Sequence, residues 1–304
     1  MNDPARKALF VALPYLVFAA LAAVSWNRWI EPYVDTGREL VVPWRVAQGE
    51  RLYRDVRFYY GPLAPYLAAG AERAAGRSLP ARIAIAAAVA LAHLEALRRI
   101  ASRALLPGRA ALAASLAVAV GFFLRPGGCH LFPYSLDTAI AVAAATWSLL
   151  SASEARRPRG LGLGLCLFAA LTSRPEIGLA AAALVLVSVP RKQLRTTILP
   201  AGASLAAAGL VYALVSLGTP IETLRREGWL AFLSVPPEFR NVYLAFSGLD
   251  RPALRMTELA LAAVLLLLLA GWLVLLAFVS RTRGRGVATA AAALSLGLLA
   301  AVRL

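Results

Sequence analysis

Two short apolar runs separated by a polar turn decide the fold class of this chain. They read GLGLGLCLFAALT (160–172) and IGLAAAALVLVSV (177–189), neither contains a charged residue, and Ser173-Arg174-Pro175-Glu176 lies between them. A helix that crosses a membrane needs about 20 residues, so each run is short for a span. The pair predicts either two short spans or one long hairpin broken at the turn, because irregular backbone at membrane depth is tolerated only where protein buries it.

Further apolar runs on both sides of this pair extend the pattern over the whole sequence. The 304 residues are 60% hydrophobic and 16% charged, whereas soluble domains are about 25% charged. We therefore predict an all-α polytopic integral membrane protein, with one transmembrane domain over residues 1–304. Its expected transmembrane helices are 8–26, 81–97, 107–124, 133–152, 160–173, 176–189, 197–217, 257–279 and 287–302.

The basic residues between these runs predict the orientation of the spans. The net charge is +16, but the arginines lie between apolar segments, where they set membrane topology rather than bind nucleic acid. With the N-terminus in the cytoplasm, two long loops, 27–80 and 218–256, lie outside. The short basic segments that then lie on the inner side are those around Arg98, Arg157, Arg191 and Arg283.

The first outer loop, 27–80, mixes aromatic with acidic residues, which an aromatic belt at the membrane surface does not explain. Thr36-Gly37-Arg38-Glu39 matches a capping box with Thr36 as the N-cap. It predicts an interfacial helix that kinks at Pro43 and ends at Gly49. After an extended segment, Pro62 predicts the start of a second interfacial helix that ends at Gly76.

Several stretches together resemble a known family. They are Asp35-Thr36-Gly37-Arg38-Glu39, Gly49-Glu50-Arg51-Leu52-Tyr53-Arg54-Asp55, Tyr59-Tyr60-Gly61-Pro62, Leu131-Phe132-Pro133-Tyr134-Ser135 and Ser173-Arg174-Pro175-Glu176. Over roughly residues 8–190 the chain resembles GT-C superfamily membrane glycosyltransferases. The closest set is the family-39-like enzymes related to protein O-mannosyltransferases and lipid A aminoarabinose transferases.

The resemblance implies a GT-C-like bundle that transfers a sugar, with inversion, from a polyprenyl-phosphate donor at the outer face of the bacterial inner membrane. The family's first-loop acid corresponds to Asp35, and Thr36 stands where many relatives have a second acid. Relatives usually continue through more spans, so the resemblance implies a short member whose acceptor recognition is missing or supplied by another chain. The expected partners are the donor and membrane lipids, without nucleic acid.

One acid and three arginines are the candidates for this chemistry. Inverting transfer needs a base for the acceptor hydroxyl and cations for the leaving phosphate. Asp35 is the expected base, because a low-dielectric membrane edge raises the pKa of a carboxylate; its alternative is a helix cap. Arg174 is the expected ligand of the donor phosphate; its alternatives are an ion pair with Glu176 and a lipid headgroup contact. Further phosphate candidates are Arg57 and Arg125.

Other acids of the outer segments are candidates for support of the site. Glu39 also fits the capping box, which we favour. Asp55, between Arg54 and Arg57, fits an arginine-held structural pair equally well. Glu176 follows Arg174 in the turn. At the inner end of the second span, His93 and Glu95 are expected either to cap the helix or to pair with Arg98 or Arg99.

Aromatic residues and one histidine complete the candidates. Tyr59, Tyr60 and Trp44 stack on a sugar ring in one interpretation and pack between the interfacial helices in the other, which we favour. His130 with Asp35 is a weaker candidate for a divalent metal site, because a lone histidine is more often structural. In the second outer loop, Trp229 and Phe232 either line the rim of the site or only anchor the loop.

Two functions of other classes remain open. One is a catalytically inactive GT-C-like subunit, which the length and the single acid favour. The other is a transporter of a lipid-linked precursor, which would predict charged residues or helix breaks at mid-membrane and paired half-repeats. The polar residues lie instead near the outer ends of the predicted spans.

Overall fold

The computed structural model describes residues 4–25, 35–123, 135–153, 160–189 and 193–231. Within these ranges the chain forms α-helices joined by turns and loops, and no β-strand is present. The helices are α1 (Pro4–Ser25), α2 (Asp35–Ala47), α3 (Leu63–Ala75), α4 (Leu79–Ala104), α5 (Pro107–Phe123), α6 (Leu136–Ser153), α7 (Gly160–Ser173), α8 (Pro175–Ser188), α9 (Leu194–Val215) and α10 (Ile221–Glu227). The all-α prediction is confirmed for this part of the chain.

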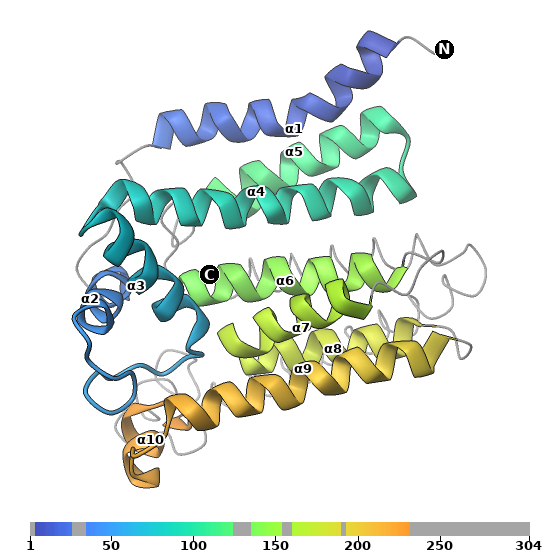
Figure 1. The fold of residues 1–304 in the computed structure, drawn as a ribbon. Coiled ribbons are helices and arrows are strands. Elements are labelled where there is room, and N and C mark those ends of the chain that lie inside the picture. The colour runs from blue at the N-terminus through green and yellow to red at the C-terminus, as the bar shows by residue number, and fades with distance from the viewer. Residues whose placement is uncertain (1–3, 26–34, 124–134, 154–159, 190–192, 232–304) are drawn as a thin grey trace, which may run out of the picture.

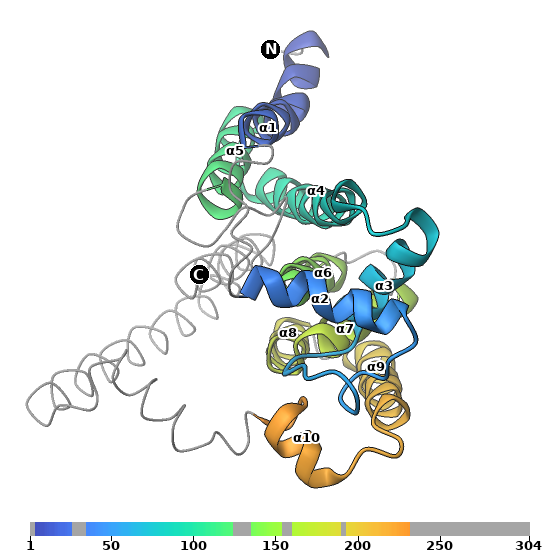
Figure 2. The same ribbon diagram turned by 90° about the vertical axis from the view of Figure 1, so that its left-hand side faces the viewer.

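The long helices lie side by side, and the short helices α2, α3 and α10 gather at one end of them (Figure 1). Helices α4, α6 and α8 begin at this end, whereas α1, α5, α7 and α9 finish at it. Figure 2 looks onto this end, with α2 and α3 lying across the long helices. The described parts of the two predicted outer loops therefore share one end of the bundle, which we call the cap end.

Three of the described helices are long and apolar enough to cross a membrane: Pro4–Ser25, Leu79–Arg103 and Leu194–Val215. They fit a membrane protein. The predicted nine-span count is not established, because the spans 257–279 and 287–302 lie outside the described residues. Helices α7 and α8 have 14 residues each, about 21 Å at 1.5 Å per residue. They form a hairpin with arms shorter than the roughly 30 Å hydrocarbon core.

Small residues let the helices of this hairpin pack closely. A Cβ atom on Gly178 would lie 2.6 Å from the backbone nitrogen of Leu171, so only glycine fits where α8 crosses α7. The Ser204 hydroxyl of α9 donates to the carbonyl of Gly164 in α7 at 2.7 Å. The two arms of the hairpin thus pack closely on each other and α7 is joined to α9, which gives the turn at Arg174 a defined position at the cap end.

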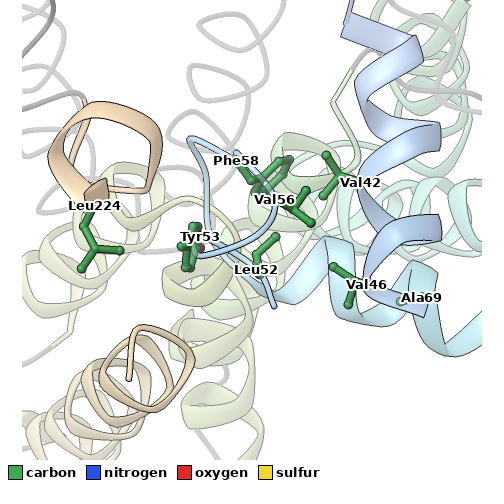
Figure 3. Close-up of a cluster of buried hydrophobic side chains, with 8 residues drawn as sticks. All are labelled: Val42, Val46, Leu52, Tyr53, Val56, Phe58, Ala69 and Leu224. Carbon is green, nitrogen blue, oxygen red and sulfur yellow. The ribbon is translucent and has the colours of Figure 1, made fainter. Parts of the chain in front are cut away.

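A separate hydrophobic core holds the cap end together. It joins α2, α3, the loop after α2 and α10, and Figure 3 shows its side chains: Val42, Val46, Leu52, Tyr53, Val56, Phe58, Ala69 and Leu224. Tyr53 is fully buried at a positive φ of 69°, an unfavourable backbone conformation for a large residue, and its hydroxyl donates to the carbonyl of Tyr60 at 2.6 Å. Residues 53–55 form a turn closed by a bridge between Leu52 and Val56, so the predicted extended segment is interrupted there. The burial of the Tyr53 side chain fixes this turn and the loop that leads to Tyr60.

The described part of the second outer loop packs on the first. The amide of Phe58 donates to the carbonyl of Glu227 at 3.1 Å. The ring of Trp229 contacts that of Tyr212 in α9 at a tilt of 47°, with centroids 4.6 Å apart, and its indole N–H donates to the Ser216 hydroxyl at 3.1 Å. Up to residue 231 these contacts anchor the loop, and Phe232 lies outside the described residues.

The local predictions for the first loop are confirmed in part. Gly49 and Gly76 have positive φ angles of 98° and 71° and follow the ends of α2 and α3, as expected. The capping box is wrong. Helix α2 already includes Asp35 and Thr36, so Thr36 is not an N-cap. The Glu39 carboxylate lies instead near the start of α6, beside the Leu136 amide and Asp137.

Candidate functional site

Arg174 is held in the turn between α7 and α8 by two acids and a hydroxyl. Its Nε lies 2.5 Å from Asp137 Oδ2 and its Nη1 lies 3.2 Å from Glu176 Oε1. Its Nη2 donates to the Ser135 hydroxyl at 3.3 Å. The ion pair with Glu176, which was one of the alternatives to a phosphate ligand, is present. Asp137 is the more buried of the two acids, since its side chain is 0% exposed and that of Glu176 is 52% exposed.

Asp137 and Arg38 are site residues that were not among the candidates predicted from the sequence, and Asp137 is the more deeply buried of them. It lies in the first turn of α6, where the positive end of the helix dipole favours an acid, and the Ser135 hydroxyl donates to its Oδ1. The available signal was an acid near the start of a predicted span, two residues after Ser135. An acid at that position is costly in a membrane unless a cation compensates it, and Arg174 is that cation.

The ring of Tyr60 lies against two guanidinium groups. The Cζ of Arg174 is 3.8 Å and the Cζ of Arg38 is 4.9 Å from the ring centroid. Phe58 packs edge-on against the same ring, with centroids 5.6 Å apart. Tyr60 therefore contacts cations and another aromatic ring of the first loop, and each cation–π contact stabilises a guanidinium at a partly desolvated position.

Gly61 brings the segment after α2 onto the α7–α8 turn. Its amide donates to the carbonyl of Ser173 at 3.0 Å. A Cβ atom at this position would lie 2.6 Å from that carbonyl oxygen and closer still to the carbonyl oxygen of Thr172. Only glycine permits this approach. Two of the stretches that carry the family resemblance, 59–62 and 173–176, thus contact each other directly.

Glu39 is the second buried acid of the site. Its Oε1 lies 3.7 Å from Nη2 of Arg38. Burial, and then the charge of Asp137, raise the pKa of Glu39 to about 8, while Arg38, the Leu136 amide and Arg82 act in the opposite direction. Near neutral pH this carboxyl group is therefore mostly protonated, and it can exchange a proton within the physiological range.

Asp35, the expected base, begins α2 one helical turn before Glu39. Residues four apart lie on the same face of a helix, so the backbone places residues 35 and 39 on one face. The Asp35 side chain is outside the described part of the structure. Arg125 and His130 also lie outside the described residues. The phosphate role of Arg125 and the metal pair of Asp35 with His130 therefore stay predictions. Among the described residues, no group of three or more His, Cys, Asp or Glu could hold a metal ion.

The remaining candidates of the first loop lie in structural contacts. Arg57 pairs with Glu227 of α10 at 2.8 Å, and its side chain is 71% exposed. Asp55 accepts the amide of Arg51 at 2.9 Å and lies 3.7 Å from Arg54, which favours the structural alternative for this acid.

The other two aromatic candidates for sugar stacking, Tyr59 and Trp44, take no part in the ring contacts of Tyr60 that are described above. Tyr59 is half-buried. Trp44 lies under the guanidinium of Arg77, 4.7 Å from its ring centroid.

At the opposite end of the bundle, the predicted pairing of Glu95 is confirmed with both partners. Its carboxylate lies 2.7 Å from Arg98 Nε and 2.5 Å from Arg99 Nε, and the Tyr15 hydroxyl of α1 donates to it as well. This cluster links α1 to α4 and is separate from the cap end.

Comparison with family models, curated proteins and solved structures found no match for this chain. What the site can bind or transfer is therefore inferred from its own geometry. Two arginines, from α2 and the α7–α8 turn, contact one tyrosine ring. Each of them has a buried acid beside it, Glu39 beside Arg38 and Asp137 beside Arg174. Arginines in such a setting bind anionic oxygens, and an acid with a near-neutral pKa transfers protons.

Proposed function

We propose that this chain transfers a sugar from a polyprenyl-phosphate donor to an acceptor at the outer face of a bacterial inner membrane, with inversion at the anomeric carbon. The observation that carries the proposal is the convergence of separate resembling stretches on Tyr60. Arg38 comes from the first stretch, Gly61 lies beside the ring, and Arg174 reaches it from the α7–α8 turn. Stretches far apart in the sequence thus share one site.

Asp35 acts as the base in this proposal. Its carboxylate takes the proton of the acceptor hydroxyl as the acceptor oxygen bonds to the anomeric carbon, and the bond from that carbon to the phosphate oxygen breaks. The lipid phosphate leaves with the bonding electron pair. Arg174 and Arg38 neutralise the developing charge, since both guanidinium groups are held at the Tyr60 ring. Asp137 fixes the position of Arg174.

The proposal is tested with purified protein, a polyprenyl-phosphate sugar and a cell-envelope fraction as the source of acceptor. The wild-type chain should release polyprenyl phosphate. Asp35→Asn should bind the donor normally but lower turnover by roughly 10²–10⁴, the contribution of a positioned base. Asp55→Asn is the matched control, because Asp55 is an exposed acid of the same loop, and it should retain full turnover.

Two outcomes would contradict the proposal. If Asp35→Asn transferred the sugar at the wild-type rate, Asp35 would not be the base. Donor binding without release of polyprenyl phosphate by the wild-type chain, with any acceptor fraction, would instead support the inactive subunit.

A further inference from the structure

Helix α2 contains a proline at a position where it removes a hydrogen bond. In an α-helix the amide of residue 43 donates to the carbonyl of residue 39, and Pro43 has no N–H. The carbonyl of Glu39 therefore cannot receive its usual helical partner. Glu39 is also the residue whose carboxyl group lies beside Asp137, so the backbone of α2 is weakened where a site residue needs a defined position.

Arg82 of α4 donates to this carbonyl. Its Nη1 lies 2.6 Å from the carbonyl oxygen of Glu39, and its Nη2 lies 3.1 Å from that of Leu40. The charge of Arg82 is compensated by Glu72 of α3, and the two side chains are 8% and 6% exposed. A buried cation thus joins α2, α3 and α4 at one point.

We propose that Arg82 is a positioning residue: its guanidinium supplies the hydrogen bond that Pro43 cannot make and thereby holds Glu39 against the start of α6. The inference rests on the proposed function only in treating Glu39 and Asp137 as parts of a working site. Hydrogen bonding by Arg82 to the α2 backbone is a property of the fold.

The first test removes the guanidinium without leaving an unpaired buried acid. Glu72→Gln with Arg82→Gln replaces the ion pair by two neutral amides of similar size. Turnover at saturating donor should fall about tenfold or more, the scale of a lost charge-assisted hydrogen bond, with little change in KM for the donor. Arg73→Gln is the matched control, since Arg73 also donates to α2 carbonyls, those of Val46 and Ala47, but at the exposed end of the helix. It should leave turnover unchanged.

The second test uses the proline itself. Pro43→Ala restores an amide at position 43, so the Glu39 carbonyl regains a donor within the helix. Adding Pro43→Ala to the paired variant should return turnover to within about threefold of wild type, as expected for two changes that act on one bond. If the paired variant fails to insert, the same substitutions in the Pro43→Ala background should insert. If Arg82 acted only through its ion pair with Glu72, and not through the Glu39 carbonyl, Pro43→Ala would give no rescue.

The titration of Glu39 provides a readout that does not require glycosyl transfer. Infrared difference spectra against Glu39→Gln report protonation of this carboxyl group. The groups that face it are Arg38 of α2, Arg82 of α4 and Asp137 of α6. Loss of the Arg82 charge alone would raise its pKa, whereas release from burial and from Asp137 would lower it. Burial and Asp137 act more strongly on this carboxyl group than the charge of Arg82 does. The paired variant should therefore lower the pKa of Glu39, and Pro43→Ala, which changes no charge, should raise it again.

An unchanged Glu39 titration and turnover in the paired variant, or no reversal by Pro43→Ala, would overturn the inference. The expected titration shifts in a chain that never releases polyprenyl phosphate would support Arg82 as the positioning residue and reject the proposed glycosyl transfer.

Discussion

At Arg174 a cation and its acid are buried together, so removing one partner leaves the other without compensation. Arg174→Met should lower the free energy of unfolding by about 3–5 kcal/mol, because Asp137 is then buried without its cation. Adding Asp137→Asn should recover much of that loss. Unfolding of the single and double variants in detergent gives the coupling between the two positions. Additive effects would show that the pair is not a unit.

Glu39 makes stability depend on pH in a defined window. Its pKa is about 8 in the fold against an ordinary value of 4.5, so between these values the folded chain binds more protons than the unfolded chain. Stability from this group is therefore full below about pH 4.5 and is lost as the pH rises to 8, by at most about 1.4 kcal/mol per pH unit. Glu39→Gln should flatten the dependence of unfolding free energy on pH in this window. If the unfolding free energies of the wild type and of Glu39→Gln changed in parallel with pH, Glu39 would not be the group that titrates in this window.

At Gly61 the segment after α2 contacts the α7–α8 turn, and a larger residue at this position should push the two apart. Gly61→Ala places a Cβ atom against the carbonyl oxygens of Thr172 and Ser173, and overpacking of this kind costs about 1–3 kcal/mol. Gly70→Ala is the matched control, because a Cβ atom on Gly70 in α3 has no atom within 4 Å and alanine favours a helix. Thermal unfolding of both variants decides the point; equal stability would mean that the 59–62 segment does not rest on the α7–α8 turn.

The helices whose positions depend on local sequence patterns could be predicted from the sequence. Apolar runs and the glycine and proline residues at their ends located most of the described helices, including the break at Arg174. The capping box at Thr36 was wrong because the same short motif occurs inside helices, and the Glu39 carboxylate lies beside the Leu136 amide at the start of α6. Asp137 was missed because its meaning depends on Arg174, which is 37 positions further along the chain. Sequence spacing carries no signal for such a long-range pair.

At the scale of the whole molecule, the described parts of both long loops form one cap on one end of the bundle (Figure 2). The proposed chemistry requires that this end faces outward, as the distribution of arginines predicts. Arg54 in the first loop and Glu222 in α10 are exposed at the cap end, and Arg109 is exposed near the start of α5 at the other end. These three positions therefore report the orientation of the molecule.

Single cysteines at these positions test the orientation, in a background where Cys129 and Cys166 are replaced by serine. In intact cells, an impermeant maleimide should label Arg54→Cys and Glu222→Cys, since both lie on the cap. Arg109→Cys should react only after permeabilisation, and its reaction then proves that the position is accessible. Labelling of Arg109→Cys in intact cells, with protection of both cap positions, would place the cap in the cytoplasm. Arg38, Glu39 and Arg174 would then face the wrong compartment for a donor presented outside, and the proposed glycosyl transfer at the outer face would fail with the topology.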